Sequence, residues 1–449
     1  MLKKSKINFY IVMWFWTKWS VKSRSNMDDK QKRLNVGLFL DTFFPMIDGV
    51  IVVVDNLARR LAKYCNVTVF VPDGRKKFDD LALPYKVVRC KKKFPLIFLD
   101  YDMPLPGSDK DFKAAIKNSH LDIVHIHSPF NICTMAVKYA KKNNIPIVGT
   151  LHSQYKLDFK RAVKFNFLAD MMVRRIMRTI NSCDECWPVN DGIDDLFIKE
   201  YRLTAKTKIH YNATDFVKID FTQKDFDEMD QKYNIAGDEK VFMFVGRINK
   251  LKNIFFIADS LKILKERGFK FKMFFIGSGA DEKRLIAKLK KEKLQDSVVL
   301  TGKVSDRNEL AKFYARSDLF LFPSKYDTDG LIKYEGACYN TPTLLLKGVH
   351  CSSNVTDNVN GYLSEATAQA YADKIVDIFS DMDKYNEVCK RAHQDLYRTW
   401  DDSVAQTLKD YYRVIEEKKL AIAKAAEEDA QKSKKSKKSS KASAQPSAF

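Results

Sequence analysis

Long hydrophobic runs are missing from this sequence of 449 residues. The apolar stretch 7–16 is ten residues long, with Asn8 its only clearly polar residue, and Lys18 interrupts its extension. A membrane-spanning helix needs about 20 apolar residues, and no small-residue cleavage site follows. We therefore expect neither a membrane span nor a secretory signal there. Two explanations stay open: translation starts at Met27, or residues 7–19 lie in a membrane interface, where their three tryptophans are favoured.

Metal-ligating clusters and nucleic-acid motifs are also missing. The eight cysteines are scattered, and the close pair Cys183 and Cys186 has no second pair at the spacing of a zinc site. We interpret the cysteines as reduced packing residues of a cytoplasmic protein, and we expect no bound metal. A nucleic-acid-binding protein is a rival hypothesis suggested by the basic charge alone, and we do not favour it.

The net charge of +21 is concentrated at the two ends of the chain. Residues 1–26 carry six basic and no acidic side chains, and residues 430–449 carry six lysines and no acid, which leaves +9 for the rest. Such ends either contact an anionic surface or remain solvated and disordered. For residues 430–449 we favour disorder.

Short apolar runs alternate with longer helical patterns from residue 34 onward. Strands are predicted in two series, at 35–40, 67–71, 86–89, 122–126, 146–150 and 186–189, and then at 241–245, 271–276, 298–301, 319–323 and 342–346. Helices are predicted at 50–64, 254–267, 281–293 and 307–316. This alternation predicts an α/β protein with two Rossmann-like domains, each with a parallel sheet covered on both faces.

An acidic motif follows the predicted strand 319–323. Asp327 and Glu335 are eight residues apart, with Gly330 and Leu331 between them. The first acid would lie at the carboxyl end of the strand, where open α/β sheets bind ligands, and the second on the helix that follows. The backbone amides of Gly330 and Leu331 would lie at the start of that helix and would donate hydrogen bonds to a phosphate or a sugar hydroxyl.

A basic motif follows the predicted strand 241–245. Gly246 at the strand end lets the backbone approach a ligand closely. Arg247 offers a bidentate fork for phosphate, and Lys252 adds a compact charge. Both cations lie in a strand-to-helix loop, so this loop is predicted to bind a diphosphate.

Together these motifs resemble the group 1 family of retaining glycosyltransferases, of the bacterial mannosyl/glucosyltransferase and glycogen-synthase kind, which have the GT-B fold. The acidic motif is similar to the family's E-x7-E motif, with Asp327 at the first position. Residues 246–253 are similar to its G-R-x-x-x-E-K-G/N motif, with Leu251 in place of Glu. Residues 41–50 are similar to its D-x-x-x-P-x-x-G-G-V loop, with Asp48 in place of the first glycine.

The resemblance covers roughly residues 34–415 and implies a role for each motif. Arg247 and Lys252 would stabilise the leaving diphosphate, Asp327 would orient the sugar ring, and Glu335 would hold the ribose. The other residues that the resemblance assigns to donor binding are Gly49, Gly246, Gly277, Val304, Gly330 and Leu331. Gly277 would lie beside the nucleotide, and the backbone near Val304 would meet the base.

Two histidines alternate at the end of the strand 122–126. Because side chains alternate along a strand, His125 and His127 share a face, and His127 is nearer the carboxyl end. His127 matches a family histidine beside the reacting sugar, where a neutral imidazole can accept from a hydroxyl. We interpret His125 as a core residue and His152, after the next strand, as a second candidate.

The resemblance also implies a division of the chain. We predict an N-terminal extension (1–33), a first domain that binds the acceptor (34–212), a second domain that binds the nucleotide sugar (213–402), a helix that crosses back to the first domain (403–418), and a basic, largely disordered tail (419–449).

A basic stripe with apolar residues marks the segment 156–180. On a helical wheel its cations, together with Phe167 and Met171, fall within one stripe of about 80°, as on helices that bind anionic membranes. The stretch 91–98 is a second basic and apolar patch. The alternative is that 156–180 forms two shorter, partly buried helices and that the stripe has no function.

We therefore predict retaining transfer of a hexose from a nucleotide-diphosphate sugar, without metal or further cofactor. The acceptor would be a membrane glycolipid or a cell-envelope or exopolysaccharide precursor, reached from the inner face of the cell membrane. Donor sugar, base, acceptor and oligomeric state stay open. The alternative is a non-catalytic GT-B subunit that stabilises a partner transferase.

Overall fold

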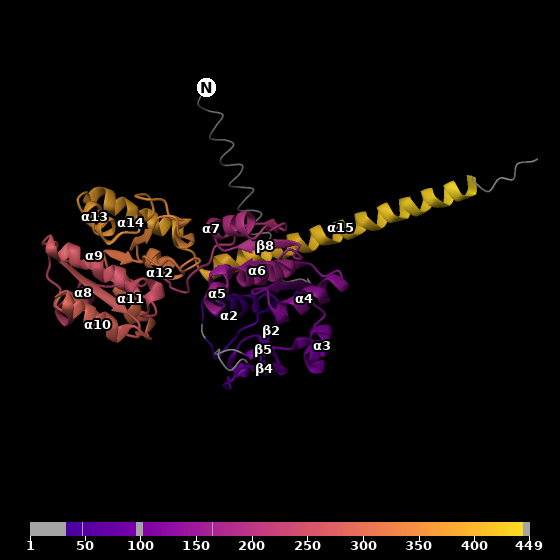
Figure 1. Ribbon diagram of the computed structural model, residues 1–449, viewed down its shortest axis with the longest axis horizontal. Helices are drawn as coiled ribbons and strands as arrows, with labels where there is room; N and C mark the ends of the chain where they lie inside the picture. Colours follow the sequence, from indigo (N-terminus) through magenta and orange to yellow (C-terminus); the bar gives the residue numbers. More distant parts are fainter. Residues whose placement is uncertain (1–32, 47, 96–101, 164, 443–449) are drawn as a thin grey trace, which may run out of the picture.

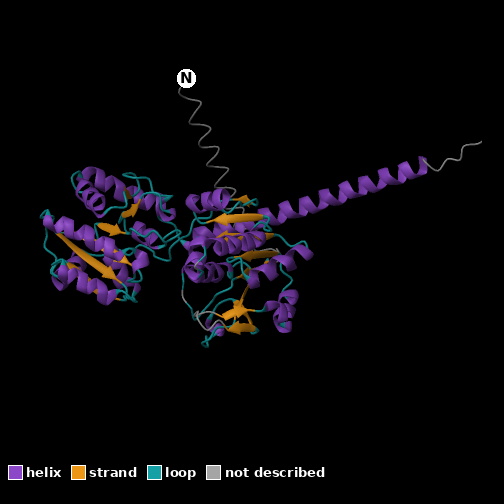
Figure 2. Cartoon of the chain, in the orientation of Figure 1, coloured by secondary structure: helices purple, strands orange, loops and turns teal. Residues whose placement is uncertain are grey.

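The computed structural model describes residues 33–46, 48–95, 102–163 and 165–442. The predicted interfacial segment at 7–19 and the choice of start codon lie outside the described residues. Figure 1 shows two lobes side by side, and the last helix lies across the first lobe and projects beyond it. Strands occupy the centre of each lobe, with helices around them (Figure 2).

The first domain is built on a sheet of seven parallel strands in the order β3-β2-β1-β6-β7-β8-β9. The strands are β1 (Asn35–Phe39), β2 (Asn66–Pro72), β3 (Lys86–Cys90), β6 (Ile123–Ile126), β7 (Ile147–Leu151), β8 (Glu185–Pro188) and β9 (Lys206–Thr207). The helices are α2 (Gly49–Leu61), η1 (Asp80–Ala82), η2 (Pro106–Ser108), α3 (Lys110–Asn118), α4 (Asn131–Lys142), α5 (Tyr155–Ala162), α6 (Asn166–Ile180), α7 (Asp191–Asp195) and the π-helix η3 (Leu196–Glu200). Alternate strand residues are buried against α3, α4 and α6 on one face and against α2 on the other.

The second domain is built on six parallel strands in the order β12-β11-β10-β13-β14-β15. The strands are β10 (Lys240–Val245), β11 (Phe271–Ile276), β12 (Val298–Gly302), β13 (Leu319–Leu321), β14 (Thr343–Leu346) and β15 (Tyr362–Ser364). The helices are α8 (Gln223–Tyr233), η4 (Lys250–Lys252), α9 (Ile254–Glu266), α10 (Glu282–Lys291), α11 (Arg307–Arg316), α12 (Ile332–Cys338), η5 (His350–Ser352), α13 (Ala368–Ile378) and α14 (Met382–Leu396). Because helices cover both faces of this sheet, β11 is buried at every residue. The predicted fold with two parallel sheets is confirmed.

The last helix, α15 (Trp400–Ala442), crosses back to the first domain, as predicted. Val404, Tyr411 and Val414 are buried in the same apolar cluster as α2. The sequence predicted a largely disordered tail from residue 419, but the helix continues to Ala442. Alanine, lysine and glutamate dominate this part of the chain, and all three are good helix formers without burial. Leu420 is 70% exposed, so the helix leaves the domain surface near this point.

The segment 156–180 forms two helices, as the alternative interpretation stated. Val163 adopts an extended backbone between α5 and α6, which interrupts the single stripe. Lys156 on α5 pairs with Asp170 on α6 at 2.9 Å. The sequence analysis missed the antiparallel hairpin of β4 (Lys93–Pro95) and β5 (Asp102–Pro104), because strands of three residues show no periodicity.

Candidate active site

A cavity of about 650 Å³ opens between the two domains. Its walls are the loops that follow parallel strands of both sheets, which is where open α/β sheets bind ligands. It is lined by seven of the predicted residues, namely Gly49, Gly246, Arg247, Lys252, Asp327, Gly330 and Leu331. Residues that the sequence analysis missed or ranked lower also line it, among them His152, Gln154, Asp158, Arg161, Asn212, Tyr326 and Asp329. The predicted residues His127, Gly277, Val304 and Glu335 lie outside this lining.

Glycines at the ends of β10 and β11 bring two loops of the second domain into close contact. Gly246 and Gly277 have φ angles of 149° and 139°, which side chains rarely tolerate. A Cβ atom on Gly277 would lie 2.0 Å from the carbonyl oxygen of Gly246. The amide of Gly277 in turn donates to the Gly302 carbonyl at 2.8 Å, so three strand ends meet beside the cavity.

Lys252 and Asp327 form an ion pair in the wall of the cavity. Lys252 Nζ lies 2.6 Å from Asp327 Oδ1, and the two side chains are only 21% and 18% exposed. The Lys252 amide donates to the side chain of Asn249, which caps the short helix η4. Asp327 Oδ2 is buried without a hydrogen-bond partner among the described residues.

The loop 322–331 is tied to the first domain through Asp329. This buried carboxylate accepts hydrogen bonds from Asn212 Nδ2 at 2.7 Å and from Asn190 Nδ2 at 3.4 Å. It also accepts from Lys333 Nζ at 2.9 Å and from the Tyr334 hydroxyl at 2.8 Å. Lys333 is fully buried, so its charge is balanced by this carboxylate. No local pattern in the sequence indicated this network.

Glu335 lies on the first turns of α12, as predicted, with its carboxylate largely buried. The Tyr314 hydroxyl donates to Glu335 Oε2 at 2.9 Å, and Arg307 Nη1 lies 3.9 Å from Oε1. Burial raises the pKa of Glu335 to about 7, although Arg307 and the Tyr314 hydrogen bond oppose the shift. Near neutral pH this carboxyl is therefore divided between its protonated and ionised forms.

His127 does not line the cavity but contacts a second histidine that does. His127 Nδ1 lies 3.1 Å from His152 Nε2, and His152 is the histidine that lines the cavity. Burial lowers the pKa of His127 well below its ordinary value and that of His152 to about 4, so both rings are neutral at pH 7. His127 Nε2 is buried without a partner among the described residues. His125 bonds to Tyr411 and Thr150, both at 2.7 Å, which confirms it as a satisfied core residue.

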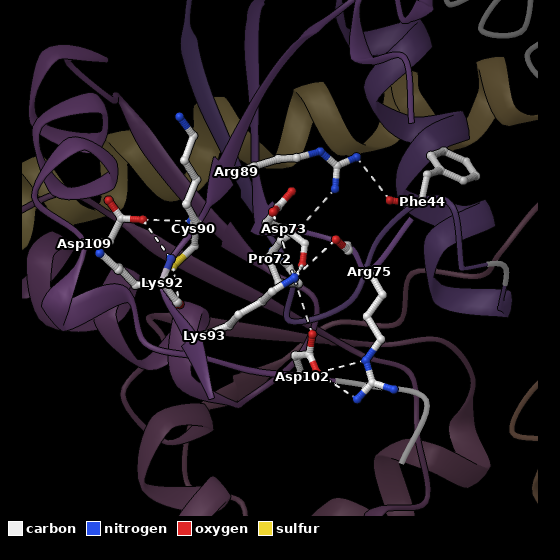
Figure 3. A network of polar contacts seen from close by, with 12 residues as sticks. Phe44, Pro72, Asp73, Arg75, Arg89, Cys90, Lys92, Lys93, Asp102 and Asp109 are labelled. Atoms are coloured by element: carbon white, nitrogen blue, oxygen red, sulfur yellow. Dashed lines mark hydrogen bonds and ion pairs between the residues drawn. The ribbon is translucent and has the colours of Figure 1, made fainter. Parts of the chain in front are cut away.

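The loop before α2 carries Gly49 to the cavity. Asp48 Oδ1 accepts a hydrogen bond from the Ile51 amide at 2.8 Å and thereby caps α2. This cap explains the aspartate at a position where the family motif has glycine. Arg89 braces the same loop, because its guanidinium donates to the carbonyls of Phe44 and Pro72, both at 3.1 Å (Figure 3).

The β4–β5 hairpin is attached beside this loop by a second group of charged side chains. Asp102 accepts from Arg75 at 2.7 Å, and Lys93 Nζ lies 3.4 Å from its other oxygen (Figure 3). Asp109 accepts from the amides of Lys91 and Lys92 at 2.8 and 3.2 Å. These contacts attach β4 and β5 to the rest of the first domain.

An exposed basic and apolar surface lies on α5 and α6, and we call it the α5–α6 surface. Phe165, Phe167 and Met171 are 61%, 65% and 53% exposed. The exposed cations of the two helices are Lys160, Arg161, Arg174, Arg175 and Arg178. The surface borders the cavity, because Arg161 also lines it.

No group of three or more histidine, cysteine, aspartate or glutamate side chains among the described residues could hold a metal ion. No helix within the described ranges is both long and apolar enough to cross a bilayer.

Comparisons with known proteins identify both halves of the chain. Residues 47–217 match the model described as Glycosyltransferase Family 4, and residues 225–395 match Glycosyl transferases group 1. An alpha-monoglucosyldiacylglycerol synthase of Streptococcus pneumoniae is 25% identical over 335 residues, which is 74% of this chain and 75% of that protein. A GDP-mannose-dependent alpha-mannosyltransferase of Corynebacterium glutamicum is 23% identical over 403 residues, 85% of this chain and 89% of that protein.

Solved structures share the fold. Sucrose-phosphate synthase of Thermosynechococcus elongatus superposes with a TM-score of 0.69 at 18% identity, over 85% of this chain and 99% of that one. Anabaena HepE in complex with UDP and glucose superposes with a TM-score of 0.63 at 17% identity, over 84% of this chain and 100% of that one. The chain therefore belongs to the group 1 glycosyltransferases, with a Family 4 domain in its first half, and it has the GT-B fold.

Proposed function

We propose that this glycosyltransferase moves a hexose, with retention of configuration, from a nucleotide-diphosphate sugar to a membrane lipid or a cell-envelope glycan precursor. The observation that carries the proposal is the convergence of Arg247, Lys252 and Asp327 on one cavity between the domains. Cations for a diphosphate and a carboxylate for a sugar hydroxyl then face the same space.

The leaving diphosphate would be bound by Arg247 and Lys252. Its negative charge grows as the bond to the sugar breaks, so cations placed beforehand stabilise the transition state more than the ground state. The amides of Gly330 and Leu331, at the start of α12, would add hydrogen bonds. Because these groups supply the charge, the proposal includes no metal ion.

The sugar would lie between the two domains. Asp327 Oδ2 and His127 Nε2 are buried polar atoms without partners among the described residues, and each could bond to a sugar hydroxyl. Of the acids that line the cavity, Asp327 pairs with Lys252 through its other oxygen, Asp48 caps α2, Asp158 accepts from Tyr326 and Asp329 accepts from four donors. This supports transfer on one face of the sugar, in which a donor phosphate oxygen accepts the acceptor's proton and no enzyme carboxylate attacks.

The nucleotide would extend along the second domain. Glu335 would accept hydrogen bonds from the ribose, Gly277 would leave room beside the nucleotide, and the backbone near Val304 would meet the base. HepE binds UDP, and the relative from Corynebacterium is named for GDP-mannose. Both UDP- and GDP-sugars are therefore the first donors to test.

A membrane would be the place of transfer. Cations interleaved with exposed Phe165, Phe167 and Met171 suit an anionic bilayer surface, where the apolar side chains enter the interface and the cations contact phosphates. Two similar proteins, from Streptococcus pneumoniae and Acholeplasma laidlawii, are named for a glucosyl diacylglycerol product. We therefore propose peripheral association with the inner face of the cell membrane and a lipid acceptor.

The first experiment is turnover of a panel of UDP-, GDP- and ADP-sugars by the wild-type protein and by Arg247→Ala. We expect one donor class to be hydrolysed slowly in the absence of acceptor, and the variant to be nearly inactive. Arg267→Ala, a surface arginine on the same domain that pairs with Asp373, is the matched control and should keep the wild-type rate. The anomeric configuration of the product, measured by proton NMR, tests retention.

The membrane part is tested separately by vesicle flotation. Wild-type protein should float with vesicles that contain anionic lipid, and Phe167→Ser should float less. Ile286→Ser removes a similarly exposed apolar side chain from the second domain and should not change flotation. Equal flotation of all three proteins would contradict the role of the α5–α6 surface.

The alternative is a non-catalytic GT-B subunit that stabilises a partner transferase. The departures from the family motifs at Asp48, Leu251 and Asp327 favour it. Asp327→Glu separates the two, since an enzyme should change its rate or its preferred donor, whereas a scaffold should be unaffected.

A further inference from the structure

Helix α5 of the first domain contacts the loop 322–331 of the second domain at Tyr326. The Tyr326 hydroxyl donates to Asp158 Oδ1 at 2.5 Å, and the Arg161 guanidinium lies 5.1 Å from the centre of the ring. Gln154 Nε2 donates to the Tyr326 carbonyl oxygen at 3.1 Å. Asp158 and Arg161 are three residues apart and share one face of α5, and Gln154 immediately precedes this helix. Both the side chain and the backbone of Tyr326 are thus bound by the first domain.

The position of Tyr326 determines that of its neighbour Asp327. The two residues are consecutive, and both amides donate to Ser324 Oγ at 3.4 Å, which makes them one compact turn. Asp327 then pairs with Lys252 across the cavity wall. A shift of the Tyr326 ring would therefore move the carboxylate that the proposed function assigns to the sugar.

We propose that Tyr326 is a positioning residue for glycosyl transfer, and that its contact with Asp158 and Arg161 links the closure of the two domains to the placement of Asp327. The inference rests on the proposed function, because it takes Asp327 as the sugar ligand. If the domains open, the contact must break, since its two sides belong to different domains. Asp327 would then reach its working position only when the first domain closes over the donor.

The chemistry of the contact suits this role. A carboxylate that accepts from a phenol in a partly buried position forms a short, strong hydrogen bond. Burial and the nearby Asp158 charge raise the pKa of Tyr326 to about 12, so the hydroxyl keeps its proton at neutral pH. Arg161 lies against the ring and limits its rotation.

The test uses Tyr326→Phe, Asp158→Ala and the double variant in the full chain, with the nucleotide sugar that the wild-type protein turns over. The loss of one hydrogen bond to a charged group should lower kcat by about tenfold to a hundredfold. The KM for the donor should change little, because the diphosphate and ribose contacts remain. The double variant should be no slower than the slower single variant, since both changes remove the same contact.

The controls separate positioning from folding. Tyr64→Phe removes the hydroxyl of an exposed tyrosine in the first domain and should leave kcat unchanged. If Asp158→Ala fails to fold, Tyr326→Phe, which lacks a single oxygen atom, decides the question alone. A wild-type kcat in Tyr326→Phe, or effects of the two changes that multiply, would overturn the inference and leave the proposed function intact. No turnover of any nucleotide sugar by the wild-type protein would overturn both.

Discussion

Binding of the nucleotide sugar should depend on pH through Glu335. The pKa of this carboxyl is about 7 in the free protein, chiefly because it is buried, against 4.5 for an exposed glutamate. The difference corresponds to about 3 kcal/mol that favours the protonated form. A ribose hydroxyl donates best to the ionised carboxylate, so binding must first remove the proton.

The expected curve follows from this competition. Above about pH 8 the site is ionised and affinity is constant, and below pH 7 the affinity falls by about tenfold per pH unit. Titration calorimetry from about pH 5.5 to pH 8 covers the change. His152, whose pKa is about 4, stays neutral over this range. A nucleotide sugar is a better probe than the free diphosphate, whose terminal phosphate would itself titrate.

Glu335→Gln is the control for this pH dependence, and its profile can also refute the role assigned to Glu335. An amide does not ionise, so this variant should bind more weakly at pH 8 but with a flat pH profile. A flat profile in the wild-type protein, or the same slope in Glu335→Gln, would refute the assignment of Glu335 to the ribose. It would also show that another group in the site titrates.

Four further predictions test the rest of the site and the fold. Lys252→Ala should lower kcat by about a hundredfold to a thousandfold, as for the loss of one preorganised transition-state contact, in a donor-turnover assay. Asp327→Asn should lower kcat more than it raises the donor KM, because the diphosphate contacts remain; equal changes in both would argue against a sugar contact. His152 has a lowered pKa in the folded state, so the unfolded chain binds more protons between pH 6.5 and 4. The stabilisation that depends on His152 should therefore decrease by up to about 3 kcal/mol as the pH falls through that window, so the melting temperature of the wild-type protein should approach that of His152→Asn. The comparison of the two proteins cancels Glu335, whose raised pKa acts in the opposite direction. Tyr411→Ala should cost about 3–5 kcal/mol in urea unfolding, because this side chain of α15 is fully buried against the first domain, whereas Tyr412→Ala, at a 43% exposed neighbour, should cost far less.

The sequence by itself determined the two-domain α/β architecture and seven of the residues that line the cavity. Apolar runs such as 271–276 predict buried parallel strands, and parallel strands place their following loops at one edge of the sheet. Arg247, Lys252 and Asp327 all lie in such loops, so local sequence order was enough to bring them together.

The tertiary structure alone decided which side chains of the first domain complete the cavity. Asp158 and Tyr326 are 168 residues apart, and Asn190 and Asp329 are 139 apart, so no period or motif relates them. Their contacts arise from how two folded domains pack against each other, and a local pattern carries no information about that packing. The same holds for His127, whose strand position was correctly predicted but whose partner His152 depends on the pairing of β6 with β7.

The length of helix α15 also shows what the sequence could predict and what it could not. Its first part could be predicted from buried residues that recur at helical spacing against the first domain, such as Val404 and Tyr411. Residues 419–429, 431 and 432 are exposed, so the amphipathic signal ends near residue 418 although the helix continues. In this part the high helix propensity of alanine, lysine and glutamate keeps the chain helical. The prediction of disorder gave more weight to the charge of these residues than to their helix propensity.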